Sequence, residues 1–148
     1  MLDETVTAPI DILLIEDDPG DVWLTREAFV EHKLRNRLVV HGDGTEALRY
    51  LRECSAIGSA LPDLILLDLN LPGLDGRDVL TELTGDPVLS DIPIVVLTNS
   101  LAERDILQAR QLRVADYVCK PLDFDRLFDV VKAVEGLAFT VVRVPSAR

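Results

Sequence analysis

Acidic, hydroxyl and amine side chains stand directly after several apolar runs of this 148-residue chain. The residues at these positions are Glu16, Asp17, Asp18, Asp68, Asn70, Thr98 and Lys120. Carboxylates that are brought close together oppose one another's ionisation unless protons or a cation compensate the charge. Oxygen ligands without a nearby His or Cys favour a hard cation, Mg²⁺ rather than Zn²⁺. The pattern therefore predicts a divalent-cation site with an ammonium group and a hydroxyl beside it.

The acidic trio divides into two kinds of residue. Asp18 precedes Pro19, which is typical of a helix N-cap followed by proline in the first turn. Glu16 and Asp17 end an apolar run, where an ionised side chain costs free energy unless it has a partner or a role. We therefore assign Glu16 and Asp17 to the site, and Asp18 to the start of a helix.

The elements that must position these residues alternate between strands and helices. Continuous apolar runs are typical of strands buried on both faces of a parallel sheet, and the intervening segments have helical spacing. We predict strands near 10–16, 37–41, 63–68, 93–98 and 115–119, and helices near 20–33, 45–56, 76–85, 101–112 and 123–136. The result is a doubly wound α/β sandwich, in which ligands bind at the carboxyl ends of the strands.

Composition limits the classes of function. The chain has 15 Lys and Arg against 26 Asp and Glu, a formal net charge of −11, which argues against binding nucleic acid or anionic lipid. No stretch reaches the ~18 apolar residues of a membrane span, and the first ten residues do not resemble a signal peptide. Cys54 and Cys119 lie too far apart in sequence for a metal motif, so free buried thiols are expected. A cytoplasmic protein is predicted.

The chain divides into one domain and two short extensions. We predict an N-terminal extension over residues 1–9, a single domain over 10–136 and an apolar C-terminal extension over 137–148. Twelve residues are too few for an output domain, so a single-domain protein that acts through protein contacts is expected. The apolar extension is expected to pack on the domain or across a dimer.

Four segments together resemble a known family over about residues 10–136. They are LLIEDDPGD (13–21), PDLILLDLNLPGLDG (62–76), IPIVVLTNS (92–100) and ADYVCKPLD (115–123). In this order they resemble the receiver domain of response regulators of two-component signalling. The resemblance implies a CheY-like (βα)5 fold with a five-stranded parallel sheet in the order 2-1-3-4-5.

Residue by residue, the resemblance implies a phosphoryl acceptor and a metal site. Asp68 matches the phosphoacceptor. Glu16, Asp17 and Asp68, with the main-chain carbonyl of Asn70, match the ligands of Mg²⁺, for which Mn²⁺ could substitute. Such a protein is not an enzyme in the ordinary sense, because it assists only its own phosphorylation and dephosphorylation.

The same resemblance implies a switch. Thr98 and Lys120 match the residues that contact the phosphoryl group, and Thr98 and Tyr117 match the switch pair, in which the hydroxyl moves to the phosphoryl group and the ring turns inward. Lys120–Pro121 matches the family's cis peptide bond. Phosphorylation is expected to change the surface formed by the fourth helix, fifth strand and fifth helix.

Further segments resemble a narrower group. EDDPGDVWLTREAF (16–29), GDPVLSDIPIVVLTNS (85–100) and the C-terminal extension are similar to small regulators partnered with bacterial and cyanobacterial phytochrome kinases. The receiver resemblance implies a phosphohistidine of a sensor kinase as the donor, and the narrower group implies a phytochrome-type kinase and a homodimer. A downstream protein partner is expected because the chain has no room for an output domain.

Three alternatives come from other classes. A phosphorylation-independent binding module on the same scaffold would usually have lost part of the constellation. An aspartyl-phosphate phosphatase of the haloacid dehalogenase type has its nucleophile after the first strand, whereas Asp68 is central here. A flavodoxin-like electron carrier binds a phosphate at its first loop, which Glu16, Asp17 and Asp18 would repel.

Overall fold

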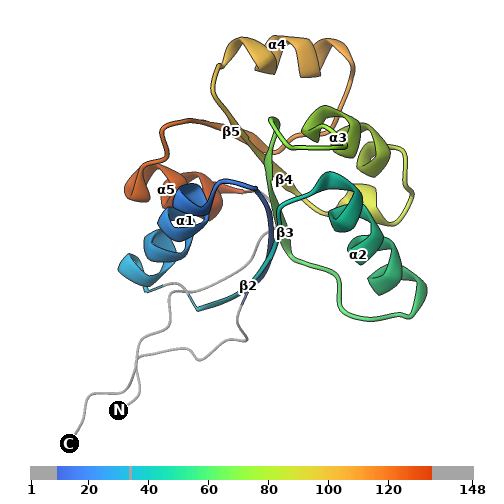
Figure 1. Ribbon diagram of the computed structural model, residues 1–148, viewed down its shortest axis with the longest axis horizontal. Coiled ribbons are helices and arrows are strands. Elements are labelled where there is room, and N and C mark those ends of the chain that lie inside the picture. The colour runs from blue at the N-terminus through green and yellow to red at the C-terminus, as the bar shows by residue number, and fades with distance from the viewer. Residues whose placement is uncertain (1–9, 34, 135–148) are drawn as a thin grey trace, which may run out of the picture.

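The computed structural model describes residues 10–33 and 35–134 as alternating strands and helices (Figure 1). In chain order they are β1 (Ile10–Ile15), α1 (Pro19–Glu31), β2 (Asn36–His41), α2 (Gly44–Ala56), β3 (Leu64–Asp68), α3 (Gly76–Thr84), a 3-10 turn (Leu89–Asp91), β4 (Ile94–Thr98), α4 (Ala102–Ala109), β5 (Asp116–Cys119) and α5 (Phe124–Ala133). The extensions 1–9 and 137–148 lie outside the described residues.

The five strands form one parallel sheet in the order β2-β1-β3-β4-β5, which confirms the predicted fold. In Figure 1, α1 and α5 cover one face of the sheet and α2 and α3 cover the other. Alternate residues of β1 serve the two faces: Ile12 and Leu14 pack with α1 and α5, whereas Leu13 and Ile15 pack with α2 and α3. The apolar runs are continuous because both faces are covered.

The strand order reverses between β1 and β3, which are neighbours in the sheet. On one side of this pair the sheet continues with β2, and on the other side with β4 and β5. Loops that leave such a pair diverge to opposite faces and open a crevice at the carboxyl ends of the strands. Glu16 follows β1 and Asp68 ends β3, so both stand at this crevice.

Three helices end earlier than the sequence predicted. The helices expected over 20–33 and 101–112 stop at Glu31 and Ala109. Two residues after each end, the backbone has a positive φ, 57° at Lys33 and 58° at Gln111. The helix expected over 123–136 stops at Ala133, where Val134 is extended. Apolar spacing continues past these points, but the backbone has already left the helical region.

A close backbone approach positions the loop after β3. The N–H of Gly76 donates to the carbonyl of Leu69 at 3.1 Å. A Cβ added at Gly76 would lie 2.6 Å from the Cα of Leu69 and would also clash with the carbonyl oxygen of Asp68. Glycine is therefore required here, and it brings the start of α3 against the end of the strand that carries Asp68.

The structure also bears on the two cysteines and on the expected lack of a membrane span. Cys54 is buried as predicted, but Cys119 is exposed, because it ends β5, the edge strand of the sheet formed by the described residues. Among the described helices, none combines the length and the apolar character needed to cross a membrane.

Candidate functional site

The structure brings three carboxylates together at the end of β1 and β3. Oxygen atoms of Glu16, Asp17 and Asp68 all lie within 4.8 Å of one another. Glu16 and Asp68 are 1% and 2% exposed, whereas Asp17 is exposed at the mouth of the crevice. The cluster thus consists of two buried acids and one that meets solvent.

Lys120 reaches into this cluster from the end of β5. Its Nζ lies 2.8 Å from Oε1 of Glu16, 2.8 Å from Oδ2 of Asp21 and 3.4 Å from Oδ2 of Asp68. Its side chain is only 12% exposed. The Lys120–Pro121 peptide bond is cis, and the N–H of Lys120 donates to the carbonyl of Thr98 at 2.7 Å. The ammonium group is therefore a central part of the site.

Asp21 is a site residue that the sequence analysis missed. It lies in the first turn of α1, where an acidic side chain also favours the helix dipole. The sequence feature that could have indicated Asp21 is the start of the helix at Asp18 and Pro19. The side chain of Asp18 accepts the N–H of Gly20, and Pro19 begins α1. That start fixes the next turn beside the strand ends, and the sequence alone did not show that Asp21 faces Lys120.

The charges in the cluster do not balance. Burial raises the pKa of Glu16 to about 7, and the nearby Asp68 carboxylate adds to this rise while Lys120 opposes it. Burial alone would lower the pKa of Lys120, but hydrogen bonds to Asp21 and Glu16 more than offset it, and its pKa lies above the usual range. Negative charge therefore exceeds what one ammonium compensates, and the oxygen-only donor set fits a hard divalent cation.

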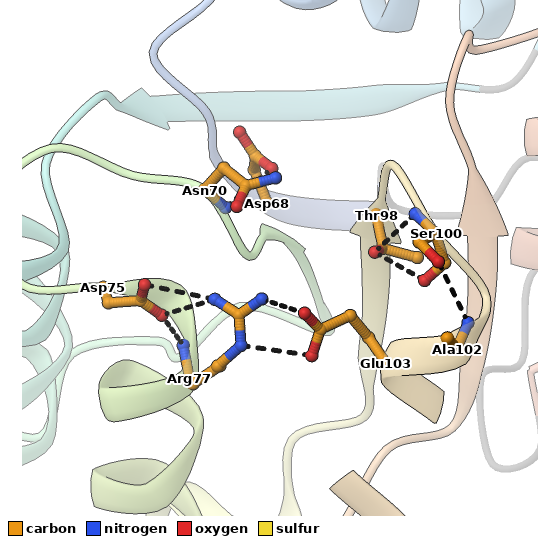
Figure 2. A network of polar contacts seen from close by, with 8 residues as sticks. All are labelled: Asp68, Asn70, Asp75, Arg77, Thr98, Ser100, Ala102 and Glu103. Carbon is orange, nitrogen blue, oxygen red and sulfur yellow. Dashed lines mark hydrogen bonds and ion pairs between the residues drawn. The ribbon is translucent and has the colours of Figure 1, made fainter. Parts of the chain in front are cut away.

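Both carboxylate oxygens of Asp68 have neighbours. Oδ1 accepts the N–H of Asn70 at 3.1 Å, and Oδ2 faces the ammonium of Lys120 at 3.4 Å. Asn70 itself is exposed in the loop after β3, beside Asp68 (Figure 2). This loop and Lys120 fix the orientation of the carboxyl group.

Thr98 and Tyr117 lie on the neighbouring strands β4 and β5. Thr98 is 1% exposed, its hydroxyl donates to the carbonyl of Ser100 at 3.0 Å, and it accepts the N–H of Ser100 at 3.2 Å. Tyr117 is 7% exposed and belongs to the core cluster that also contains Leu107 of α4. The inward ring and the Thr98–Ser100 contact thus coexist in this structure.

Comparisons with known proteins agree with this geometry. The family model described as the response regulator receiver domain matches residues 12–132. The response regulator Rcp1 of Synechocystis sp. is 38% identical over 148 residues, which are 99% of this chain and 100% of Rcp1. The structure of its Mn²⁺-bound form has a TM-score of 0.71 at 37% identity, over 92% of this chain and 100% of that one.

Two further solved structures are similar. The bacteriophytochrome response regulator AtBRR has a TM-score of 0.80 at 36% identity, over 93% of this chain and 100% of its own. The phosphorylated cyanobacterial phytochrome response regulator RcpA has a TM-score of 0.72 at 41% identity, over 94% and 100% of the two chains. With its 2-1-3-4-5 sheet and an acidic cluster at the carboxyl ends of the strands, this chain belongs to the response regulator receiver domain family.

Proposed function

We propose that this response regulator accepts a phosphoryl group on Asp68 from a phosphohistidine of its sensor histidine kinase. The observation that supports Asp68 most directly is its position at the end of β3, the middle strand of the sheet. There it is buried in the acidic cluster between Lys120, which faces its Oδ2, and the N–H of Asn70, which donates to its Oδ1. Similarity to regulators of phytochromes supports a phytochrome-type kinase as the donor.

The transfer is a displacement at phosphorus. An oxygen of Asp68 forms the new P–O bond while the P–N bond to the imidazole breaks, and the imidazole nitrogen keeps the electron pair. Catalysis of such a transfer depends mainly on positioning and on cations that neutralise the equatorial oxygens. Lys120 is already beside Oδ2 of Asp68 and supplies one positive charge. The product is an acyl phosphate, which water can later hydrolyse to restore the carboxylate.

The metal ligands we propose are Glu16, Asp17 and Asp68, with the main-chain carbonyl of Asn70. Mg²⁺ is the expected ion, and Mn²⁺ could substitute, in line with the Mn²⁺-bound form of Rcp1. Held by these residues, a divalent cation would offset negative charge on the transferring oxygens. The residues of this chain contribute orientation, because two of the acids are buried and held by Lys120.

Intact mass spectrometry tests the proposed function. After incubation with acetyl phosphate and Mg²⁺, the full chain should gain the mass of one phosphoryl group, and the gain should disappear in EDTA. The adduct should be released by hydroxylamine, as an acyl phosphate is. If neither acetyl phosphate nor a phosphorylated histidine kinase gives an adduct, phosphorylation-independent binding becomes the better explanation.

Replacing Asp17 by Asn should weaken Mg²⁺ binding by about tenfold or more, because one anionic ligand is lost from the site. Stability should hardly change, since Asp17 is exposed. Titration calorimetry with Mg²⁺ measures the affinity. Asp18→Asn is the matched control, because Asp18 is also exposed and Asn is an equally good N-cap. Equal affinities in the two variants would remove Asp17 from the ligand set.

We also propose a homodimer that uses the face of α4 and α5 together with residues 137–148. Leu101 and Ile106 of this face are 45% and 47% exposed, which supports an apolar contact surface. Light scattering should show that removal of residues 137–148 weakens the dimer by about tenfold, roughly 1.4 kcal/mol. A dimer of unchanged affinity after truncation would exclude these residues from the contact.

A further inference from the structure

Arg77 connects the start of α3 to the start of α4. Its Nη1 donates to both carboxylate oxygens of Asp75 at 3.1 Å, its Nε donates to Oε2 of Glu103 at 3.1 Å, and its Nη2 pairs with Oε1 of Glu103. The side chains of Arg77 and Glu103 are 25% and 21% exposed. A two-point contact between a guanidinium and a half-buried carboxylate is a directional link between two helices. Figure 2 shows the guanidinium between the two carboxylates.

Glu103 is bonded in turn to the segment that holds Thr98. Its N–H donates to the carbonyl of Ser100 at 3.2 Å, and this carbonyl also accepts the hydroxyl of Thr98 at 3.0 Å. The N–H of Ala102 donates to Oγ of Ser100 at 3.2 Å. The first turn of α4 and the hydroxyl of Thr98 thus share Ser100, and Arg77 holds the other side of that turn (Figure 2).

The hydroxyl of Thr98 has a single hydrogen to donate. While that hydrogen is given to Ser100, it cannot be given to a phosphoryl group on Asp68. Contact with a phosphoryl group therefore requires Thr98 to leave the carbonyl of Ser100. A contact that holds Ser100 and α4 in place favours the conformation in which the Thr98 hydroxyl donates to Ser100. Such a contact shifts the equilibrium between this conformation and the one that contacts the phosphoryl group by the free energy of the contact.

We propose that Arg77 is a positioning residue that opposes phosphorylation of Asp68, because its link to Glu103 holds α4 and Ser100 where Thr98 is retained. This inference rests on the proposed function of Asp68. It assigns to Arg77 a role through Thr98, with no contact of its own to the reacting atoms.

The test compares Arg77→Gln and Glu103→Gln with the wild-type full chain. Each variant should take up phosphoryl groups from acetyl phosphate about fivefold faster in Mg²⁺, a factor typical of a modest coupling between two conformations. Before phosphorylation, the methyl resonance of Thr98 in NMR spectra should move toward its position in the phosphorylated wild type. Arg52→Gln is the matched control, because it removes another arginine–glutamate link between helices, Arg52 Nη2 to Glu82 Oε1 at 3.0 Å.

The two variants change net charge in opposite directions, which separates position from electrostatics. A simple field effect on the anionic donor would slow Arg77→Gln and accelerate Glu103→Gln, and that result would overturn the proposal. Slower transfer in Arg77→Gln alone would instead make Arg77 a phosphoryl ligand.

A second arm uses Thr98→Val, in which the hydroxyl is absent. If Arg77 acts through Thr98, the double variant Arg77→Gln/Thr98→Val should take up phosphoryl groups at the same rate as Thr98→Val alone. An equal acceleration in both backgrounds would contradict the proposal. If the wild-type protein takes up no phosphoryl group at all, the proposed function fails. If the wild type takes up phosphoryl groups normally, but both variants have unchanged rates and an unmoved Thr98 resonance, only the role of Arg77 is rejected.

Discussion

Asp68→Asn should remove all phosphoryl uptake from acetyl phosphate while the protein stays folded. The amide side chain offers no anionic oxygen to attack phosphorus, so no acyl phosphate can form. The fold should tolerate the change, because an amide oxygen can still accept the N–H of Asn70. The substitution also removes one negative charge from a cluster in which negative charge is in excess. We expect loss of the adduct by intact mass, with an unchanged or higher midpoint of thermal unfolding.

The control for this experiment is Asp91→Asn. Asp91 precedes β4, at the amino end of the strands and thus on the edge of the sheet opposite the site, and its side chain is 83% exposed. It should gain one phosphoryl group as wild type does. An adduct of undiminished yield on the Asp68 variant would show that another residue is the acceptor.

Lys120→Met should lower the free energy of unfolding by ~3 kcal/mol in EDTA, because loss of one partner leaves buried charge uncompensated. The side chains of Glu16 and Asp68 are 0% and 3% exposed, so water cannot replace the ammonium fully. Saturating Mg²⁺ should restore part of this loss, since a divalent cation supplies positive charge to the same carboxylates. Phosphoryl uptake should fall by about tenfold or more, roughly 1.4 kcal/mol of transition-state stabilisation.

Urea denaturation with and without Mg²⁺ measures the stability change. Lys132→Met on α5 makes the same replacement at an exposed position and should change stability by less than about 0.5 kcal/mol. Equal stabilities of the two variants in EDTA would mean that the Lys120 ammonium contributes no net free energy to folding.

Much of the fold and the site could be predicted because both follow from the positions of strand ends. Parallel strands place their carboxyl ends at one edge, so residues after β1 and at the end of β3, Glu16 and Asp68, had to meet there. Lys120 follows β5, and the length of its side chain lets it cross to the same cluster.

Side-chain partners on helices were not predictable in the same way. Asp21 and Arg77 lie on α1 and α3, and their contacts depend on how each helix is rotated about its own axis. A rotation by one residue would place either side chain elsewhere, and apolar spacing does not define rotation to that precision. The ends of α4 and α5 were missed because backbone angles at Gln111 and Val134, and not polarity, end these helices.

The exposed thiol of Cys119 offers a natural labelling position. The chain has two cysteines, and the other, Cys54, is buried, so a maleimide dye should react selectively at the end of β5. Cys119 pairs with Thr98 across the sheet, and its Sγ lies 3.9 Å from the carbonyl of Asn99. A fluorophore attached there would sit one strand from the Thr98 hydroxyl, so a change in its emission on phosphorylation would report a rearrangement at Thr98 without any substitution in the chain.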